Sequence, residues 1–360
     1  MKNKILILAN NSDGLYGFRG NLIAALTKEH TVVASTPNNG FFPELRALGC
    51  EVFETPIDRR GINPATDLKL LRQYKKMLKA ELPDLVITYT IKPNIYGALA
   101  CKSRKVPYAV NITGLGTAFQ SGGMLRKLVT FLYKTALKKA QVVFFENSAN
   151  RQLFIDEKIV PAEKTCLLSG AGVNLERYTL APYPADGKIH FLFIGRIMKE
   201  KGVGELFAAM ERLTAAGYDC CLDLLGEGEE DFSDSIRAGE AAGWLNYHGY
   251  QTDVRPFIQQ THCFVLPSYH EGMANTNLEC AAMGRPLITS DIPGCREAVT
   301  EGSGILCKPQ DPDSLFSAME RFLHLPHDQK AAMGTAGREH MEAVFDKEKV
   351  VQATLDALNL

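Results

Sequence analysis

Short apolar runs alternate with longer amphipathic stretches along the chain. In the first half, stretches such as 67–80 and 124–140 have helical spacing and separate the runs. An uninterrupted apolar run of four to six residues is typical of a strand that is covered on both faces, as in a parallel sheet. The runs of the first half are 5–8, 31–35, 85–89, 108–112 and 142–146. The pattern therefore predicts successive β-α-β units.

The alternation stops at residues 178–187 and then starts again. This segment holds two prolines and a glycine without periodicity, which is typical of a linker. The later runs are 190–194, 220–225, 263–266, 287–290 and 304–307. The sequence thus predicts an α/β protein with two Rossmann-like, doubly wound parallel-sheet domains that face a cleft. We expect an N-terminal domain over 1–182, a C-terminal domain over 183–345, and a helix over 346–360 that returns to the first domain.

The composition changes this picture little. The 360 residues are 46% hydrophobic and 22% charged, which excludes a disordered or disulfide-stapled protein and exceeds what one core usually supports. The nine cysteines are scattered without C-x-x-C spacing, and no histidine pair has i, i+4 spacing on a helix, so no metal site is predicted. No apolar stretch approaches 18 residues and the first ten resemble a strand rather than a signal peptide, so we expect a cytoplasmic protein.

The charge is divided unevenly along the chain. The net charge of −1 combines +11 over residues 1–182 with −12 over residues 183–360, and nine basic but no acidic residues lie between 85 and 145. A basic half favours an anionic partner, such as a phosphorylated substrate or an anionic membrane surface. The alternative is a set of solvated helix faces. On a helical wheel, Lys127, Lys134 and Lys138 form one arc opposite Leu125, Leu128, Val129, Leu132 and Ala136.

The most informative stretch is 267–286. A predicted strand ends at Pro267, a loop carries Glu271 and Gly272, and a helix is expected to begin near Asn275, where free backbone N–H groups could bind phosphate oxygens. Glu279 lies about one turn into this helix, so the two carboxylates need not flank one bond as a glycosidase pair does. Their spacing better suits separate contacts to a sugar and a ribose. The alternative is that a glutamate here only complements the helix dipole.

A second candidate follows the strand at 190–194. Gly195 ends the strand, and Arg196 and Lys201 follow on the loop at its carboxyl end, where open α/β sheets bind ligands. A guanidinium and an ammonium there could neutralise a departing diphosphate. The alternative is a basic surface loop.

Together these motifs resemble the retaining glycosyltransferases of family 4, which have the GT-B fold. The resemblance is strongest in GRIMKEKG (195–202), LGEGEE (225–230) and EGMANTNLE (271–279), which includes the family's E-x7-E spacing. It implies that Arg196, Lys201 and Glu271 are catalytic: the two cations bind the donor diphosphate, and the glutamate contacts the sugar hydroxyls. It also implies that Glu279 binds the ribose and that the base lies near Tyr250. The donor-binding set that it implies is Gly17, Gly195, Gly226, Tyr250, Gly272, Met273, Ala274, Asn275, Thr276 and Glu279.

In the N-terminal half, residues 88–97 and 113–119 look like the branch of this family that extends lipid-diphosphate-linked sugars. The acceptor-side candidates are Arg19, Tyr89, Lys92, Asn94, Thr113 and Gly114. Many members carry a histidine after the fifth strand, where this chain has asparagine at position 111 and no histidine following it, so no role of that histidine is carried over. We expect residues 10–20 to form a glycine-rich loop in which Gly17 approaches the donor, or else a plain tight turn.

Asp311 and Asp313 match the D-x-D pattern of metal-dependent glycosyltransferases. Because Pro312 follows Asp311 and an amphipathic stretch comes next, we expect a capped helix start instead. The resemblance thus implies a retaining transferase that moves a hexose or N-acetylhexosamine from a UDP-sugar to a lipid-diphosphate-linked saccharide, and with this helix start we expect no metal and no cofactor. We expect no nucleic-acid partner, and attachment to the inner face of the plasma membrane through the basic helix at 126–139. The alternatives are a GT-B sugar-nucleotide epimerase and a non-catalytic nucleotide-sugar-binding subunit.

Overall fold

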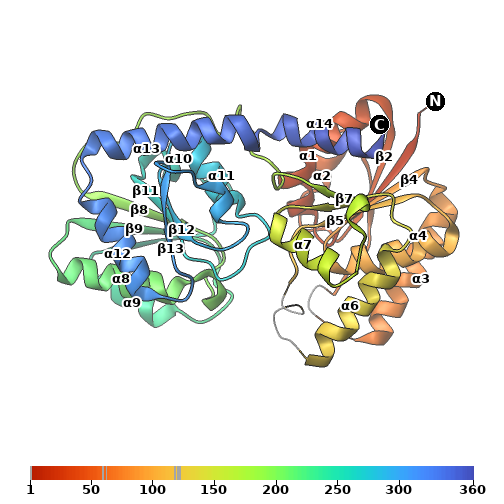
Figure 1. Cartoon of the computed structure of the whole chain (residues 1–360), viewed down its shortest axis with the longest axis horizontal. Coiled ribbons are helices and arrows are strands. Elements are labelled where there is room, and N and C mark those ends of the chain that lie inside the picture. The colour runs from red at the N-terminus through yellow and green to blue at the C-terminus, as the bar shows by residue number, and fades with distance from the viewer. Residues whose placement is uncertain (1, 59–60, 62, 117–118, 120–122) are drawn as a thin grey trace. The chain divides into compact units, whose positions relative to one another are not determined.

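The chain folds into two compact units, each built around its own parallel sheet (Figure 1). The computed structural model describes residues 2–58, 61, 63–116, 119 and 123–360. Unit 1 comprises Met1–Ala171 and Glu348–Leu360, and unit 2 comprises Gly172–Lys347. Both are doubly wound α/β units, so the predicted fold class is confirmed.

The sheet of unit 1 has the strand order β3-β2-β1-β4-β5-β6-β7, and every pair is parallel. This is the order of a Rossmann sheet, in which successive strands are added outward from β1 on one side and then, starting with β4, on the other side. The strands are β1 (Lys4–Leu8), β2 (Thr31–Thr36), β3 (Glu51–Glu54), β4 (Leu85–Tyr89), β5 (Tyr108–Ile112), β6 (Val143–Phe145) and β7 (Thr165–Leu167).

Helices cover both faces of this sheet, because successive side chains of a strand point to opposite faces. Leu6 and Leu8 of β1 belong to a core with α3, α4, α6 and α7, whereas Ile5 and Ile7 belong to a core with α1, α2 and the C-terminal α14. The bounds are α1 (Ser12–Glu29), α2 (Phe42–Ala47), α3 (Pro64–Glu81), η1 (Pro93–Gly97), α4 (Ala98–Arg104), α6 (Gly123–Leu137), α7 (Ser148–Asp156), η2 (Ala162–Lys164) and α14 (Lys347–Leu358).

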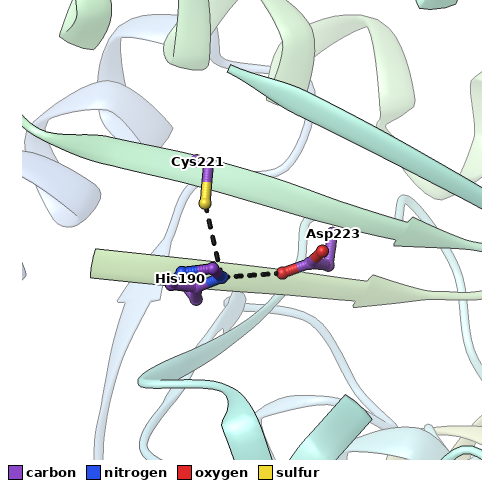
Figure 2. A group of neighbouring side chains, drawn as sticks. All are labelled: His190, Cys221 and Asp223. Atoms are coloured by element: carbon purple, nitrogen blue, oxygen red, sulfur yellow. Dashed lines mark hydrogen bonds and ion pairs between the residues drawn. The ribbon is translucent and has the colours of Figure 1, made fainter. Parts of the chain in front are cut away.

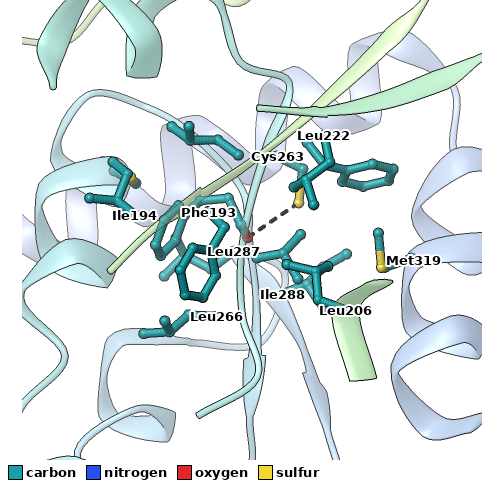
Figure 3. Packing of buried hydrophobic residues seen from close by; sticks show 14 of the residues in the cluster. Phe193, Ile194, Leu206, Leu222, Cys263, Leu266, Leu287, Ile288 and Met319 are labelled. Carbon is teal, nitrogen blue, oxygen red and sulfur yellow. Dashed lines mark hydrogen bonds between the residues drawn. The ribbon is translucent and has the colours of Figure 1, made fainter. Parts of the chain in front are cut away.

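Unit 2 repeats the arrangement with the order β10-β9-β8-β11-β12-β13, again parallel throughout. Figure 3 shows how Phe193, Leu222 and Ile288 from the strands meet Leu206 and Met319 from the helices in its buried core. The strands are β8 (Ile189–Ile194), β9 (Cys220–Leu225), β10 (Leu245–Gly249), β11 (Cys263–Leu266), β12 (Leu287–Ser290) and β13 (Gly304–Cys307). The helices are η3 (Lys199–Lys201), α8 (Val203–Ala215), α9 (Ser233–Ala241), α10 (Arg255–Gln260), α11 (Asn275–Ala282), η4 (Arg296–Ala298), α12 (Pro312–Leu323), α13 (His327–His340) and η5 (Met341–Phe345).

The proline-rich segment 178–187 belongs to unit 2, so the units divide after Ala171 and not at the predicted linker. Its backbone is held by buried Arg285, which donates to the carbonyl of Pro182 at 2.7 Å, and by Arg338, which donates to the carbonyl of Tyr178 at 2.9 Å. The Tyr183 hydroxyl also donates to the carbonyl of His262 at 2.9 Å. Prolines and the lack of periodicity indicate irregular backbone, but they do not show whether side chains elsewhere fix it.

The predicted glycine loop at 10–20 is wrong, because α1 already begins at Ser12. The Asn11 side chain caps this helix by accepting from the N–H of Gly14. Glycines three residues apart therefore share a helix face. A methyl group at Gly17 would meet no atom within 4 Å, whereas one at Gly20 would make ordinary contact with Leu48 at 3.6 Å.

Candidate functional site

The candidate donor site lies where the connections of unit 2 reverse direction, at the carboxyl ends of β8 and β11. Ligands of open α/β sheets bind at this point. The loop after β8 brings Lys201 and the loop after β11 brings Glu271, and the ammonium and the carboxylate form an ion pair. Their side chains are 18% and 13% exposed, so the pair is reachable but largely desolvated.

Close backbone contacts between these two loops position the pair. Gly202 has φ of +72°, and a Cβ atom there would lie 2.2 Å from the carbonyl oxygen of Pro267. The N–H of Tyr269 donates to the carbonyl of Glu200 at 2.9 Å. Lys201 stands between these contacts at the end of η3, so its ammonium is directed toward the second loop by backbone packing.

Arg196 lies at the same edge of the sheet and is more exposed. Its guanidinium donates to Glu229 at 2.7 Å. Gly195 and Gly226 hold the loops after β8 and β9 together, since a Cβ at Gly226 would lie only 1.7 Å from the carbonyl oxygen of Gly195. Tyr250 is exposed just beyond β10. An anion from solvent can therefore reach the guanidinium of Arg196.

Helix α11 begins at Asn275, as predicted, and its N-cap residue Ala274 offers no side-chain acceptor. The first N–H groups of such a helix carry partial positive charge and favour an anion. The preceding loop is fixed because the N–H of Ala274 donates to the carbonyl of Gly294 at 2.8 Å. Gly294 itself has φ of +87°, and a Cβ there would lie 2.8 Å from the carbonyl oxygen of Glu271. Met273 and Ala274 are buried, and Gly272 and Thr276 are partly exposed.

Glu279 has different surroundings from Glu271. Its carboxylate accepts a hydrogen bond from the hydroxyl of Tyr178, and the charges of Lys347 and Arg177 also favour its ionised form. Desolvation outweighs these favourable contacts and raises the pKa of Glu279 from 4.5 to about 7. The two carboxylates therefore have separate partners.

Arg19 and Tyr89 come together in the interior of unit 1. The guanidinium of Arg19 pairs with Glu146, which follows β6, and lies 4.9 Å from the ring centre of Tyr89 at the end of β4. All three residues are buried, and burial raises the pKa of Glu146 against the opposing effect of Arg19. Glu146 was not among the residues predicted from the sequence. The signal available was its position directly after a buried strand, at the carboxyl edge of the sheet.

The other acceptor-side candidates do not gather with this group. Asn94 is buried, and its amide donates to the carbonyl of Asn111 at 2.7 Å and accepts from Thr88 at 2.7 Å, so it fixes η1 to the sheet. Lys92 pairs with Asp67 at 2.8 Å. Thr113 and Gly114 are partly exposed after β5, and residues 117 and 118 of the same motif lie outside the described part of the chain.

Helix α6 differs from the predicted wheel. Val129 and Ala136 are buried as expected, but Met124, Leu128 and Phe131 are 87%, 53% and 64% exposed. Lys127, Lys134 and Lys138 are exposed around them. These six residues form what we call the α6 surface, where apolar side chains are flanked by cations. No helix in the described ranges is long and apolar enough to cross a bilayer.

The D-x-D pattern is a helix cap, as predicted. The Asp311 side chain accepts from the N–H of Ser314 at 2.9 Å and Pro312 occupies the first turn of α12.

Comparison with known proteins agrees with the fold and with these motifs. The family described as Glycosyl transferase 4-like matches residues 4–147, and Glycosyl transferases group 1 matches residues 188–324. Over 99% of both chains, the structure resembles a crystal structure of Anabaena HepE in complex with UDP and glucose, with a TM-score of 0.81 and 16% identity. Two parallel Rossmann-like units with this pair of domains define a glycosyltransferase of the GT-B class.

The chain belongs to glycosyltransferase family 4, since the two family models together match most of its length. It is 28% identical to the N,N'-diacetylbacillosaminyl-diphospho-undecaprenol alpha-1,3-N-acetylgalactosaminyltransferase of Campylobacter jejuni, over 97% of this chain and 96% of that one. It is also 28% identical to the UDP-Gal:alpha-D-GlcNAc-diphosphoundecaprenol alpha-1,3-galactosyltransferase of Escherichia coli, over 75% of this chain and 74% of that one.

Proposed function

We propose that this glycosyltransferase moves a hexose or N-acetylhexosamine from a UDP-sugar to a lipid-diphosphate-linked saccharide, with retention at the anomeric carbon and without a metal ion. The observation that carries the proposal is the group of Lys201, Glu271 and Arg196 at the switch point of unit 2. The two relatives named above act on diphospho-undecaprenol substrates, which supports a lipid-diphosphate acceptor.

In this proposal the chain's own cations take the place of a metal. The bond between the anomeric carbon and the diphosphate oxygen breaks, and the leaving charge moves toward Arg196, Lys201 and the first turn of α11. The acceptor oxygen bonds to the anomeric carbon from the same face, and its proton passes to the leaving phosphate. Because Lys201 is paired with Glu271 before the donor binds, its ammonium is already held in place and loses little side-chain entropy.

Product analysis tests the proposal. The purified chain is mixed with a panel of nucleotide sugars, with and without an undecaprenyl-diphosphate saccharide, in the presence of EDTA. We expect UDP release only when the acceptor is present, and a product whose anomeric configuration by NMR equals that of the donor. An epimerised sugar without acceptor would identify the enzyme as an epimerase, and binding without turnover would identify a non-catalytic subunit.

Glu271→Gln should lower turnover, with Glu301→Gln as a control, because Glu301 is an exposed carboxylate on the same unit that the proposed site does not use. A loss of turnover in both variants would contradict the role proposed for Glu271.

We further propose that the α6 surface attaches the enzyme to the inner face of the plasma membrane. Three exposed apolar side chains with i, i+4 and i+7 spacing can enter the headgroup region, and each flanking lysine contributes about 1 kcal/mol near an anionic membrane. The wild type should sediment with phosphatidylglycerol vesicles at low salt and be released at high salt.

The charge-reversed variant Lys127→Glu/Lys134→Glu/Lys138→Glu should stay in the supernatant. A matched triple reversal of exposed lysines on α3, at Lys69, Lys76 and Lys79, should still sediment. An equal loss of sedimentation in both triple variants would show that net charge alone drives vesicle binding, and it would refute a specific role of the α6 surface.

A further inference from the structure

A histidine, a cysteine and an aspartate meet on one face of the unit 2 sheet (Figure 2). The Nδ1 atom of His190 lies 3.0 Å from Oδ2 of Asp223 and 3.4 Å from Sγ of Cys221. All three ligand atoms lie within 4.8 Å of one another. The sequence spacing gave no indication of this group, because its members come from two neighbouring strands.

The register of the sheet explains the convergence. His190 is the direct partner of Cys221 in the pairing of β8 with β9. Cys221 and Asp223 are two residues apart on β9, so they point to the same face. The intervening Leu222 points into the hydrophobic core. The backbone thus presents one nitrogen, one sulfur and one oxygen to a common point.

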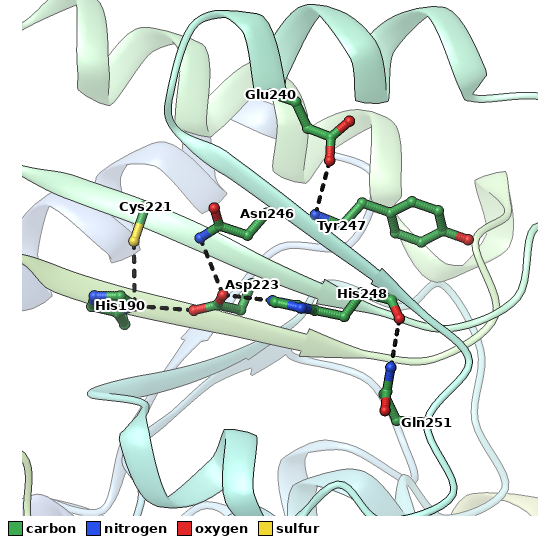
Figure 4. A network of polar contacts seen from close by, with 8 residues as sticks. All are labelled: His190, Cys221, Asp223, Glu240, Asn246, Tyr247, His248 and Gln251. Atoms are coloured by element: carbon green, nitrogen blue, oxygen red, sulfur yellow. Dashed lines mark hydrogen bonds and ion pairs between the residues drawn. The ribbon is translucent and has the colours of Figure 1, made fainter.

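A second layer of polar groups orients the carboxylate (Figure 4). Oδ1 of Asp223 faces Nε2 of His248 at 2.8 Å and accepts from the amide of Asn246 at 3.2 Å. Its other oxygen therefore remains directed at His190. Outer-shell hydrogen bonds that fix a carboxylate in this way are a regular feature of metal sites.

We propose that His190, Cys221 and Asp223 are the three protein ligands of a divalent metal site of the zinc class. Zinc takes nitrogen, sulfur and oxygen ligands at about 2.0–2.3 Å in a tetrahedron, which places ligand atoms roughly 3.3–3.8 Å apart. The observed separations of 3.0 and 3.4 Å from the His190 nitrogen lie close to this range. The Cys221 sulfur and the Asp223 oxygen, which lie within 4.8 Å of each other, would move together on binding. His190 is 38% exposed, so an ion can enter and a water molecule can occupy the fourth position.

The location of the metal site suits a structural role rather than a catalytic one. His190 and Cys221 lie near the amino ends of β8 and β9, whereas Arg196 and Lys201 follow the carboxyl end of β8. A bound ion would tie the neighbouring strands β8 and β9 of unit 2 together without touching the donor site. The proposal is independent of the proposed transfer reaction, and its readouts do not involve that reaction.

Cobalt and zinc binding to the chelator-treated full chain tests the site. One equivalent of Co²⁺ should give a thiolate-to-cobalt charge-transfer band that Zn²⁺ abolishes. Zinc at about 100-fold above its dissociation constant should raise the thermal midpoint by roughly 5–10 °C. Cys221→Ser should lose both effects, and Cys166→Ser, which alters a partly exposed thiol in unit 1, should keep both.

Two further variants keep the test decisive if Cys221→Ser does not fold. Asp223→Asn keeps the shape of the side chain but removes an anionic ligand, so Co²⁺ should bind more weakly and the band should require a higher Co²⁺ concentration. His248→Gln should keep the band but weaken binding about 10- to 100-fold, because it changes only the outer layer. A wild type without band or thermal shift would overturn the proposal and leave a hydrogen-bonded network only. A band that survives in folded Cys221→Ser would also overturn it, since another thiol would be the ligand.

Discussion

Replacing Glu279 by glutamine should affect stability and nucleotide binding in opposite directions. The pKa of this carboxyl is about 7 in the folded chain and 4.5 in its ordinary surroundings, because burial disfavours the charge. Between these pH values the unfolded chain releases a proton that the folded chain retains. The free energy of unfolding therefore falls as the pH rises from 4.5 to 7, and the loss is complete above pH 7. At about 1.4 kcal/mol for each pH unit, Glu279 costs the fold up to about 3 kcal/mol at pH 8.

Glutamine keeps the size of the side chain and removes the charge. Glu279→Gln should thus be more stable than the wild type at pH 8, by up to about 3 kcal/mol, and should differ from it little at pH 4. Urea unfolding at a series of pH values measures both quantities. If Glu279 binds the ribose, as the family resemblance implies, calorimetry with UDP at pH 8 should show weaker binding to this more stable variant. An equal shift in stability at pH 4 and pH 8 would refute the desolvation argument, and unchanged UDP affinity would refute the ribose contact.

Three further predictions concern the donor site and its surroundings. Arg196→Ala and Lys201→Ala should each lower turnover about 10²–10³-fold. The thermal midpoint of Arg196→Ala should change little, because the charge of Arg196 is exposed. Near wild-type rates in these variants would exclude the leaving-group role. Gly17→Ala should stabilise α1 by up to about 1 kcal/mol, and it should reduce turnover if the donor approaches this part of the backbone. Gly20→Ala, for which the packing also leaves room, should stabilise the helix without reducing turnover. Activity should persist in excess EDTA at 25 °C, and a loss that Mg²⁺ or Mn²⁺ reverses would contradict metal-free transfer.

The sequence predicts the central strands of both sheets and misses three of the four edge strands, for a physical reason. Strands β1 and β4 are covered on both faces, so nearly every side chain is apolar. The strands that the pattern overlooked are β3, β7 and β10, and each lies at the edge of its sheet. Their residues are largely exposed or half-exposed, so no uninterrupted apolar run marks them. An edge strand is specified by its partner, which a single sequence does not display.

The donor site could be located from sequence because its parts follow two central strands directly. The motifs at 195–202 and 271–279 fall at the carboxyl ends of β8 and β11, and strand prediction plus the rule for parallel sheets brings them together. The ion pair between Lys201 and Glu271 could not be predicted, because it depends on backbone contacts at Gly202 and Pro267. Glu146 and the His190 group were missed for the same reason, since their partners are set by strand register and helix packing.

The two units use one topology with different electrostatics. In unit 2 the charged side chains of the switch point stand on loops, partly exposed, where an anion can replace a neighbouring carboxylate as the partner of Lys201. In unit 1 the corresponding edge holds Arg19 and Glu146 in a buried pair. A buried pair contributes little net stability, yet loss of one partner leaves an uncompensated charge that costs several kcal/mol. Arg19 is thus suited to fixing α1 to the ends of β4 and β6, while exposed lysines of unit 1 lie on other surfaces, among them the α6 surface. The Arg19–Glu146 pair therefore serves the packing of unit 1, whereas the Lys201–Glu271 pair of unit 2 stays accessible to a ligand.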